Sequence, residues 1–220
     1  MEPSFAGAAA LNRRLLRKMT AHPDAPGESS WGTRNVLHAF ILSMRPKLVL
    51  EIGSHIGFGA VVIGTALKAN GFGHSFHLEP QDHYFAALSS HLQKAGLAKI
   101  SKPLKMFSTD PTLHSQFEEP VDMIFLDANH SYSHAAHDLE IADSLIAPNG
   151  LIFLDDVGLG HSGNICEEGR GGVRQALIDF SARRPDYSVI FFEPPFWLNP
   201  CGLALAWKKA GQAVDEEVLR

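Results

Sequence analysis

Residues 47–70, KLVLEIGSHIGFGAVVIGTALKAN, place a strand, a glycine turn and a helix in direct succession. The largely apolar run at 48–52 predicts a strand in the interior of a sheet. Gly53 and Gly57 bound a tight turn, and apolar residues on all sides of 58–68 predict a buried helix. A helix N-terminus offers free N–H groups, and glycine lets a ligand approach the backbone. The stretch therefore predicts half of a nucleotide-binding βαβ unit.

The glycine spacing in this turn narrows the choice of ligand. A dinucleotide fingerprint, G-x-G-x-x-G, would require glycine at His55 and Phe58, and the G-K-[ST] of a P-loop is absent. The turn instead has the pattern E-x-G-x-x-x-G from Glu51 to Gly57. A carboxylate at a strand end favours a ligand with a cationic part over a polyphosphate. A corner whose two glycines serve packing alone is the alternative interpretation.

Composition excludes several classes of protein. With 220 residues, 45% of them hydrophobic, the chain can bury one sizeable core, and a single domain is expected. The net charge of −5 gives no support to nucleic-acid binding. Cys166 and Cys201 are too few for a disulfide framework, which favours a reducing, cytoplasmic setting. No apolar run approaches the ~20 residues of a transmembrane helix, so no membrane partner is expected.

Strands and helices alternate along the rest of the chain. Further strands are predicted at 74–78, 104–107, 121–126, 151–154, 187–192 and 203–207, and helices at 5–19, 33–43, 84–95, 132–146 and 173–182. The last two strands have no helix between them and should pair as an antiparallel hairpin. We therefore expect an α/β fold with a mostly parallel, seven-stranded sheet and helices on both faces. Residues 1–45 should form a helical cap on a core of 46–220, within one domain.

Two segments beside the predicted sheet have several possible roles. The helix at 5–19 has a basic face, which suits a lid, a homodimer contact, a targeting segment or an ordinary solvated surface. Residues 158–172 contain six glycines and no predicted element. A structureless stretch of this length in a compact domain indicates a functional lid or a mobile loop.

Acidic residues recur where the predicted parallel strands end. The residues at these ends are Glu51, Glu79, Ser108, Asp127 and the pair Asp155 and Asp156. Ligands of open α/β sheets bind at this edge. Glu79 follows the glycine turn by about 20 residues, where an acid accepts hydrogen bonds from ribose hydroxyls. A surface glutamate at a strand end is the alternative.

Asp127, Asp155 and Asp156 would approach one another if the fourth and fifth strands are neighbours. Carboxylates at that range repel, which raises their pKa values or requires a cation. Oxygen ligands that are open to water suit Mg²⁺ best, with Ca²⁺ or Mn²⁺ as alternatives. The sequence therefore predicts a divalent metal here, unless some of these acids only cap the helices and loops that follow.

Two stretches resemble known methyltransferase families. LEIGSHIGFGA, at 50–60, resembles motif I of class I S-adenosylmethionine (SAM) methyltransferases and is similar to that of catechol-type O-methyltransferases. VDMIFLDANHSYSHAAHDLEIADSLIAPNGLIFLDDV, at 121–157, resembles metal-dependent small-molecule enzymes such as cephamycin and antibiotic-sugar O-methyltransferases. The resemblance covers about 33–208 and implies a Rossmann-like class I methyltransferase fold.

The resemblance also implies roles for individual residues. SAM contacts are implied at Glu51, Gly53, Ser54, Gly57, Glu79, Ser108 and Asp127. The implied metal ligands are Asp127, Asp155 and Asp156. Catechol-type enzymes carry a lysine base three residues after the first metal acid, where this chain has His130. This departure bears on the substrate more than on the reaction class.

These features together predict a SAM-dependent O-methyltransferase for a small sugar, polyol or phenol. A metal would lower the pKa of the acceptor hydroxyl, and neutral His130 would take its proton. His161 is the next candidate for contact with the substrate, and a zinc site of His130, His134 and His137 is a further alternative. N-methylation, or SAM binding without methyl transfer, are the alternative functions.

Overall fold

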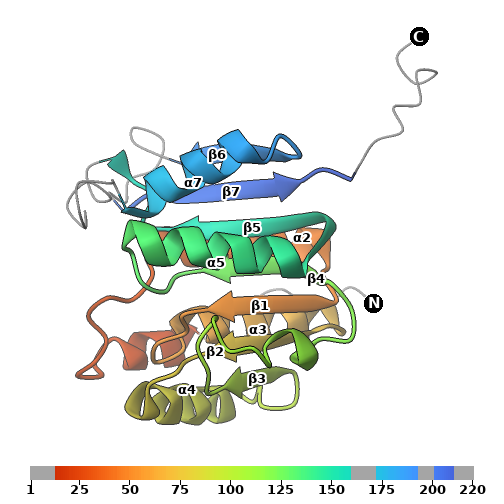
Figure 1. The fold of residues 1–220 in the computed structure, drawn as a ribbon. Coiled ribbons are helices and arrows are strands. Elements are labelled where there is room, and N and C mark those ends of the chain that lie inside the picture. Colours follow the sequence, from red (N-terminus) through yellow and green to blue (C-terminus); the bar gives the residue numbers. More distant parts are fainter. Residues whose placement is uncertain (1–12, 160–171, 193–200, 211–220) are drawn as a thin grey trace.

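The structure, a computed structural model, describes residues 13–159, 172–192 and 201–210 (Figure 1). Several segments with predicted features lie outside the described residues. They are residues 1–12, residues 160–171 of the glycine-rich segment, which include His161, and residues 193–200. Within the described ranges, no helix is both long and apolar enough to cross a membrane.

One seven-stranded sheet organises the described chain, in the order β3-β2-β1-β4-β5-β7-β6 (Figure 1). Its strands are β1 (Leu48–Ile52), β2 (His74–Leu78), β3 (Ser101–Leu104), β4 (Val121–Leu126), β5 (Ile146–Asp155), β6 (Tyr187–Phe192) and β7 (Leu203–Lys208). Pairs among β1 to β5 are parallel, whereas β7 runs antiparallel to both of its neighbours, β5 and β6. The mostly parallel sheet with a C-terminal antiparallel hairpin is thus confirmed.

Helices cover both faces of this sheet (Figure 1). They are α2 (Trp31–Met44), α3 (Phe58–Asn70), α4 (Asp82–Lys94), α5 (Tyr132–Leu145) and α7 (Gly172–Arg183), with a short 3-10 helix, η1 (His114–Gln116). On one face, α2 and α3 pack through Leu37 and Ile63 against Phe153 of β5. On the other face, α5 and α7 pack through Leu139 and Leu177. Residues 13–19 are helical as expected, and α2, from the expected cap, lies on the face of the sheet.

The unit formed by β1 and α3 is buried as its composition predicts. All five residues of β1 are buried, and so is every residue of α3 from Phe58 to Leu67. Gly57 precedes the helix with a φ of 97°, and Gly71 follows it with a φ of 78°. Both angles lie in the left-handed region that glycine adopts without steric cost. Sheet and helix therefore hold the turn between them in a fixed position.

The third strand is misplaced in the prediction. Strand β3 pairs Ser101–Leu104 with β2, whereas apolar character had indicated 104–107. Pro103 argued against a strand at these residues, because proline is confined mainly to the edges of sheets. The structure accommodates it because β3 is an edge strand. Phe107, which suggested a buried strand, is 65% exposed. Residues 106–109 are consequently free to face a ligand at the end of the strand.

The start of β5 also differs from its prediction. Helix α5 ends at Leu145, and β5 begins at Ile146 rather than at Leu151. The predicted turn at 148–150 lies within β5, where a β-bulge shifts the register of its pairing with β4. Asn149 there has a positive φ of 64°, which asparagine tolerates better than most residues. The bulge does not disturb the end of β5, where the acidic pair lies.

Candidate active site

A cavity of about 720 Å³ opens at the carboxyl edge of the parallel strands. Residues that follow β1, β2, β3 and β4 line it, together with the first two turns of α5 and with Pro26 and Gly27 of the N-terminal loop. Its volume is in the range of sites for small molecules and cofactors. The cavity therefore lies where the fold and the sequence both place a ligand.

The glycine turn forms one wall of this cavity. Gly53 has a φ of 90°, and a Cβ atom there would lie 2.4 Å from the carbonyl oxygen of Asp127. Any side chain at this position would therefore force β1 and the end of β4 apart. His55 also has a positive φ, of 49°, and its ring packs edge-on against Tyr84 at 4.3 Å between centroids. Both aromatic side chains line the cavity.

Glu79 lies at the end of β2 with its carboxylate fixed by the backbone. Its Oε2 accepts a hydrogen bond from the N–H of His55, and its Oε1 accepts one from the N–H of Gln81, both at 2.9 Å. Burial raises the pKa of Glu79, and these two backbone donors oppose the rise. Each carboxylate oxygen keeps a second lone pair. Glu79 is thus an oriented acceptor on the wall of the cavity.

Glu51, another predicted cofactor contact, is not among the residues that line the cavity. Its Oε2 lies 2.7 Å from Nδ1 of His77, and both side chains are buried. A Cβ atom on Gly59 would collide with its Oε1, so the carboxylate lies against α3. Successive side chains of a strand point to opposite faces, and Ile52 takes the place beside the cavity.

Ser54, Gly57 and Ser108 occupy different places relative to the cavity. Ser54 is buried in the turn, where its Oγ has no hydrogen-bond partner among the described residues, and it does not line the cavity. Gly57 is also outside the lining and packs against Leu88 of α4. Ser108 lines the cavity and donates a hydrogen bond to Asp138 of α5. Gly53, Glu79, Ser108 and Asp127 are therefore the predicted cofactor contacts that reach it.

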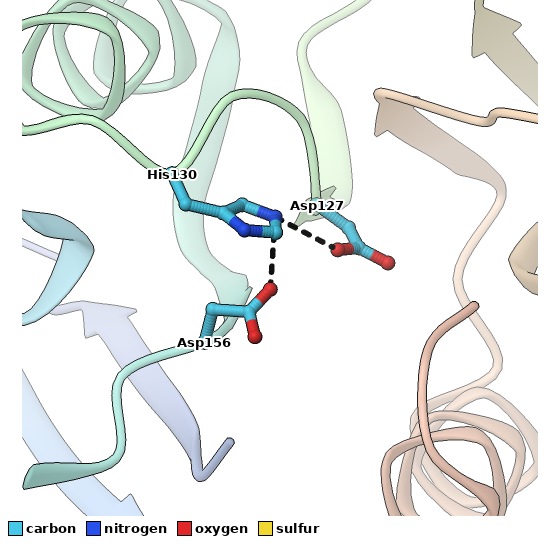
Figure 2. Close-up of side chains that lie close together, drawn as sticks. All are labelled: Asp127, His130 and Asp156. Atoms are coloured by element: carbon cyan, nitrogen blue, oxygen red, sulfur yellow. Dashed lines mark ion pairs between the residues drawn. The ribbon is translucent and has the colours of Figure 1, made fainter. Parts of the chain in front are cut away.

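Three side chains converge beside the cavity, and we call Asp127, His130 and Asp156 the acid–histidine cluster (Figure 2). Asp127 follows β4, His130 lies before α5, and Asp156 follows β5. Nε2 of His130 is 2.9 Å from Oδ2 of Asp156 and 3.9 Å from Oδ1 of Asp127. One ligand atom from each residue lies within 4.8 Å of the others, an arrangement that can hold a metal ion. Neighbouring strand ends thus bring together residues far apart in the sequence.

Asp155, the third predicted metal ligand, lies outside this cluster. Its Oδ1 accepts hydrogen bonds from Oγ1 of Thr33 at 3.2 Å and from the N–H of Asp156 at 3.1 Å. Asp156 adopts a left-handed φ of 61°, so the chain turns sharply between the two acids. One carboxylate consequently meets α2 while the other meets His130. The contact with Thr33, at the start of α2, was not foreseen from the sequence.

Burial and mutual repulsion control the charges at the cluster. Burial raises the pKa of Asp127 to about 6, and the nearby charge of Asp156 adds to this effect while His130 opposes it. Burial also raises the pKa of Asp155 well above its ordinary value, with repulsion from Asp127 and Asp156 contributing. For His130, burial would lower the pKa, but the carboxylates of Asp127 and Asp156 outweigh it and raise the pKa to about 10. The protonated imidazole therefore compensates the two carboxylates.

The other histidines of this region do not join the cluster. Nδ1 of His134 lies 2.7 Å from Oγ of Ser131, and both His134 and His137 are exposed at the wall of the cavity. Among the described residues, the group that can hold a metal contains neither of them. The geometry thus gives no support to a zinc site built from three histidines.

Asp138 is a cavity residue that was not predicted from the sequence. It is 7% exposed and lines the cavity beside Ser108, which follows β3. A signal was present, because Asp138 stands three residues after buried Ala135 and next to buried Leu139 of the same helix. A carboxylate on the buried face of a helix requires a partner.

The sequence and the fold match known proteins. Residues 50–157 match a protein family described as a methyltransferase domain. Among solved structures, the fold is similar to an O-methyltransferase from Bacillus cereus in complex with SAH. The TM-score is 0.77 at 19% identity, over 91% of each chain.

Two further structures share the fold. The O-methyltransferase TomG from Streptomyces achromogenes, involved in tomaymycin synthesis and bound to SAM, has a TM-score of 0.71 and 20% identity, over 93% of this chain and 90% of that one. The SAH-bound methyltransferase PaMTH1 from Podospora anserina also has a TM-score of 0.71, with 25% identity over 91% of this chain and 88% of that one. The predicted Rossmann-like fold of class I methyltransferases is thereby confirmed.

Proposed function

We propose that this chain, which matches a methyltransferase domain over residues 50–157 and has the class I methyltransferase fold, methylates a hydroxyl group of a small molecule, with SAM as the methyl donor. The observation that carries this proposal is the acid–histidine cluster, which lies beside a cavity at the carboxyl edge of the sheet. The three similar structures support the choice of donor, because each is described as bound to SAM or SAH. Two of them are described as O-methyltransferases.

The residues of the cavity fit SAM. Glu79 presents two oriented acceptor oxygens, which suit the two hydroxyls of a ribose. Gly53 lets the turn pack directly against the backbone of Asp127 and Ala128, and it lines the cavity where a ligand would meet the turn. SAM would supply an activated methyl group, so the protein needs to align the acceptor and to remove its proton.

The acid–histidine cluster fits a divalent cation. Asp127 and Asp156 offer carboxylate oxygens that lie close to one another, with the imidazole of His130 beside them. Oxygen ligands of this kind suit Mg²⁺ or Mn²⁺, and such a cation would lower the pKa of an acceptor hydroxyl. Asp155 lies outside this group and accepts a hydrogen bond from Thr33 instead. We therefore assign Asp127 and Asp156 as the principal ligands and Asp155 as their support.

His130 is proposed to take the proton of the acceptor at Nε2. When no cation is bound, the carboxylates of Asp127 and Asp156 raise the pKa of His130 to about 10, so its imidazole is protonated at neutral pH. Positive charge between Asp127 and Asp156 would oppose the imidazolium and restore the free base. Binding of a cation by Asp127 and Asp156 would thus favour the neutral form of His130.

The donor assignment predicts binding of SAH, the product form of SAM, with micromolar affinity, about −8 kcal/mol. NAD should bind far more weakly, because the turn lacks the dinucleotide fingerprint. Replacing Glu79 by Gln should cost about 2 kcal/mol of SAH affinity, since one acceptor oxygen is lost from a charged group. Calorimetric titration of both ligands measures this.

The matched control is Glu140→Gln, on the solvent side of α5, where Glu140 pairs with Arg183 at the surface. This variant should bind SAH as the parent protein does. Tighter binding of NAD than of SAH would overturn the donor assignment. Equal SAH affinities for Glu79→Gln and Glu140→Gln would remove Glu79 from the site.

A further inference from the structure

Asp138 and Ser108 come from different elements and meet in the wall of the cavity. Ser108 follows β3, and Asp138 lies on the buried side of α5. Oγ of Ser108 donates a hydrogen bond of 2.5 Å to Oδ1 of Asp138. This is the one hydrogen bond that the Asp138 side chain makes among the described residues. A buried carboxylate with a single donor has unused acceptor capacity that faces a ligand site.

The order of the strands places a nucleoside base beside this pair. Residues of the glycine turn follow β1, Glu79 follows the neighbouring β2, and Ser108 follows β3 at the edge of the sheet. The acid–histidine cluster follows β4 and β5 on the opposite side of β1. A nucleoside whose ribose lies at Glu79, with its reactive end toward β4, must direct its base toward β3.

We propose that Asp138 accepts a hydrogen bond from the exocyclic amine of adenine and thereby selects adenosine over its deaminated analogue. Ser108 holds Oδ1 in place by its hydrogen bond, which leaves Oδ2 to face the amine. The inference rests on the proposed function, since the adenosine is that of the methyl donor. Hypoxanthine carries a carbonyl oxygen in place of the amine, so two acceptors would face each other across a buried contact.

The electrostatics of Asp138 agree with this role. Burial raises the pKa of Asp138, and the hydrogen bond from Ser108 opposes the rise. Among the described residues, only Ser108 donates to this carboxylate. An amine of the ligand would supply the missing donor.

The test compares the affinities of SAH and S-inosylhomocysteine, whose bases differ only in the 6-amino group, which becomes a carbonyl, and in the proton that hypoxanthine carries on N1. The parent protein should prefer SAH by roughly 10- to 100-fold, the scale of one hydrogen bond to a charged acceptor. In Asp138→Asn, Ser108 still donates to the amide oxygen, so the amide NH₂ takes the position of Oδ2. SAH should then bind more weakly and S-inosylhomocysteine more tightly, and the preference should fall at least about tenfold.

Two companion variants separate recognition from packing. Glu140→Gln makes the same carboxylate-to-amide change on the exposed side of α5 and should keep the parent preference. Ser108→Ala removes the hydroxyl that fixes Asp138 and should reduce the preference, even if Asp138→Asn does not fold.

A structural role of Asp138 would weaken both ligands equally. An unchanged ratio of the two affinities in Asp138→Asn and Ser108→Ala would therefore overturn the inference. SAH that fails to bind the folded parent protein would overturn the donor assignment and this inference together. A parent protein that binds both ligands equally would overturn the inference alone.

Discussion

His130→Ala should lower kcat by roughly 10²- to 10⁴-fold, the span that one general base contributes. Nε2 of His130 lies at the meeting point of Asp127 and Asp156, where a hydroxyl held by these acids would release its proton (Figure 2). The affinity for SAH should hardly change, because Nε2 of His130 faces Asp127 and Asp156, away from the donor contacts proposed at Gly53, Glu79 and Ser108. Steady-state kinetics with SAM, together with calorimetry of SAH, measures both quantities.

The matched control for this variant is His134→Ala, one turn further along the same segment. His134 is exposed and its Nδ1 lies next to Ser131, with no carboxylate of the cluster as a partner. It should therefore keep most of the activity. If His130→Ala and His134→Ala turn over equally fast, His130 is not the base.

Added Mg²⁺ should shift the rising limb of the pH–rate profile to lower pH. In the cation-free protein, the pKa of His130 is about 10, so the imidazole is protonated below that pH and becomes a base as the pH rises through it. About one imidazole in 10³ is then neutral at pH 7. With a chelator, the rate at pH 7 should be very low and should increase about tenfold per pH unit. A divalent cation held by the two carboxylates would supply their positive partner in place of the imidazolium, so His130 would be a free base at neutral pH.

Profiles of kcat against pH, recorded with a chelator and with excess Mg²⁺ or Mn²⁺, measure this shift. Asp156→Asn is the informative variant, because it removes the carboxylate closest to Nε2 of His130. In the presence of a chelator, the rate of this variant should rise at a lower pH than the rate of the parent protein. Added Mg²⁺ should shift the profile of the variant by less than that of the parent. Identical profiles in chelator and in Mg²⁺ would reject a divalent cation at this cluster.

The sequence predicted the parts of the fold that depend on local pattern. The apolar run of β1 and the all-round apolar character of α3 are buried as their composition indicates. Strand β3 was misplaced because it is a short edge strand with Pro103 in its middle. Edge strands depend on their single neighbour more than on their own residues, so local pattern locates them poorly.

The site was predicted at the level of strand ends but not of side-chain direction. Parallel strands carry their carboxyl ends to one edge, which is why the sequence indicated Asp127 and the acids after β5. The left-handed backbone at Asp156 then decides which acid meets His130. No sequence pattern specifies that angle for an aspartate. For the same reason, the pairing of Glu51 with His77 and of Asp138 with Ser108 became evident only from the arrangement of the strands.

The most direct test of O-methylation at the acid–histidine cluster is the transfer of labelled methyl groups from SAM to a panel of polyols, phenols and amines with Mg²⁺. The parent protein should label hydroxyl compounds, and His130→Ala should lose this transfer by the factor given above. Label found only in amines would contradict methylation of a hydroxyl. Transfer to hydroxyl compounds that survives both chelation and the loss of His130 would contradict the proposed site.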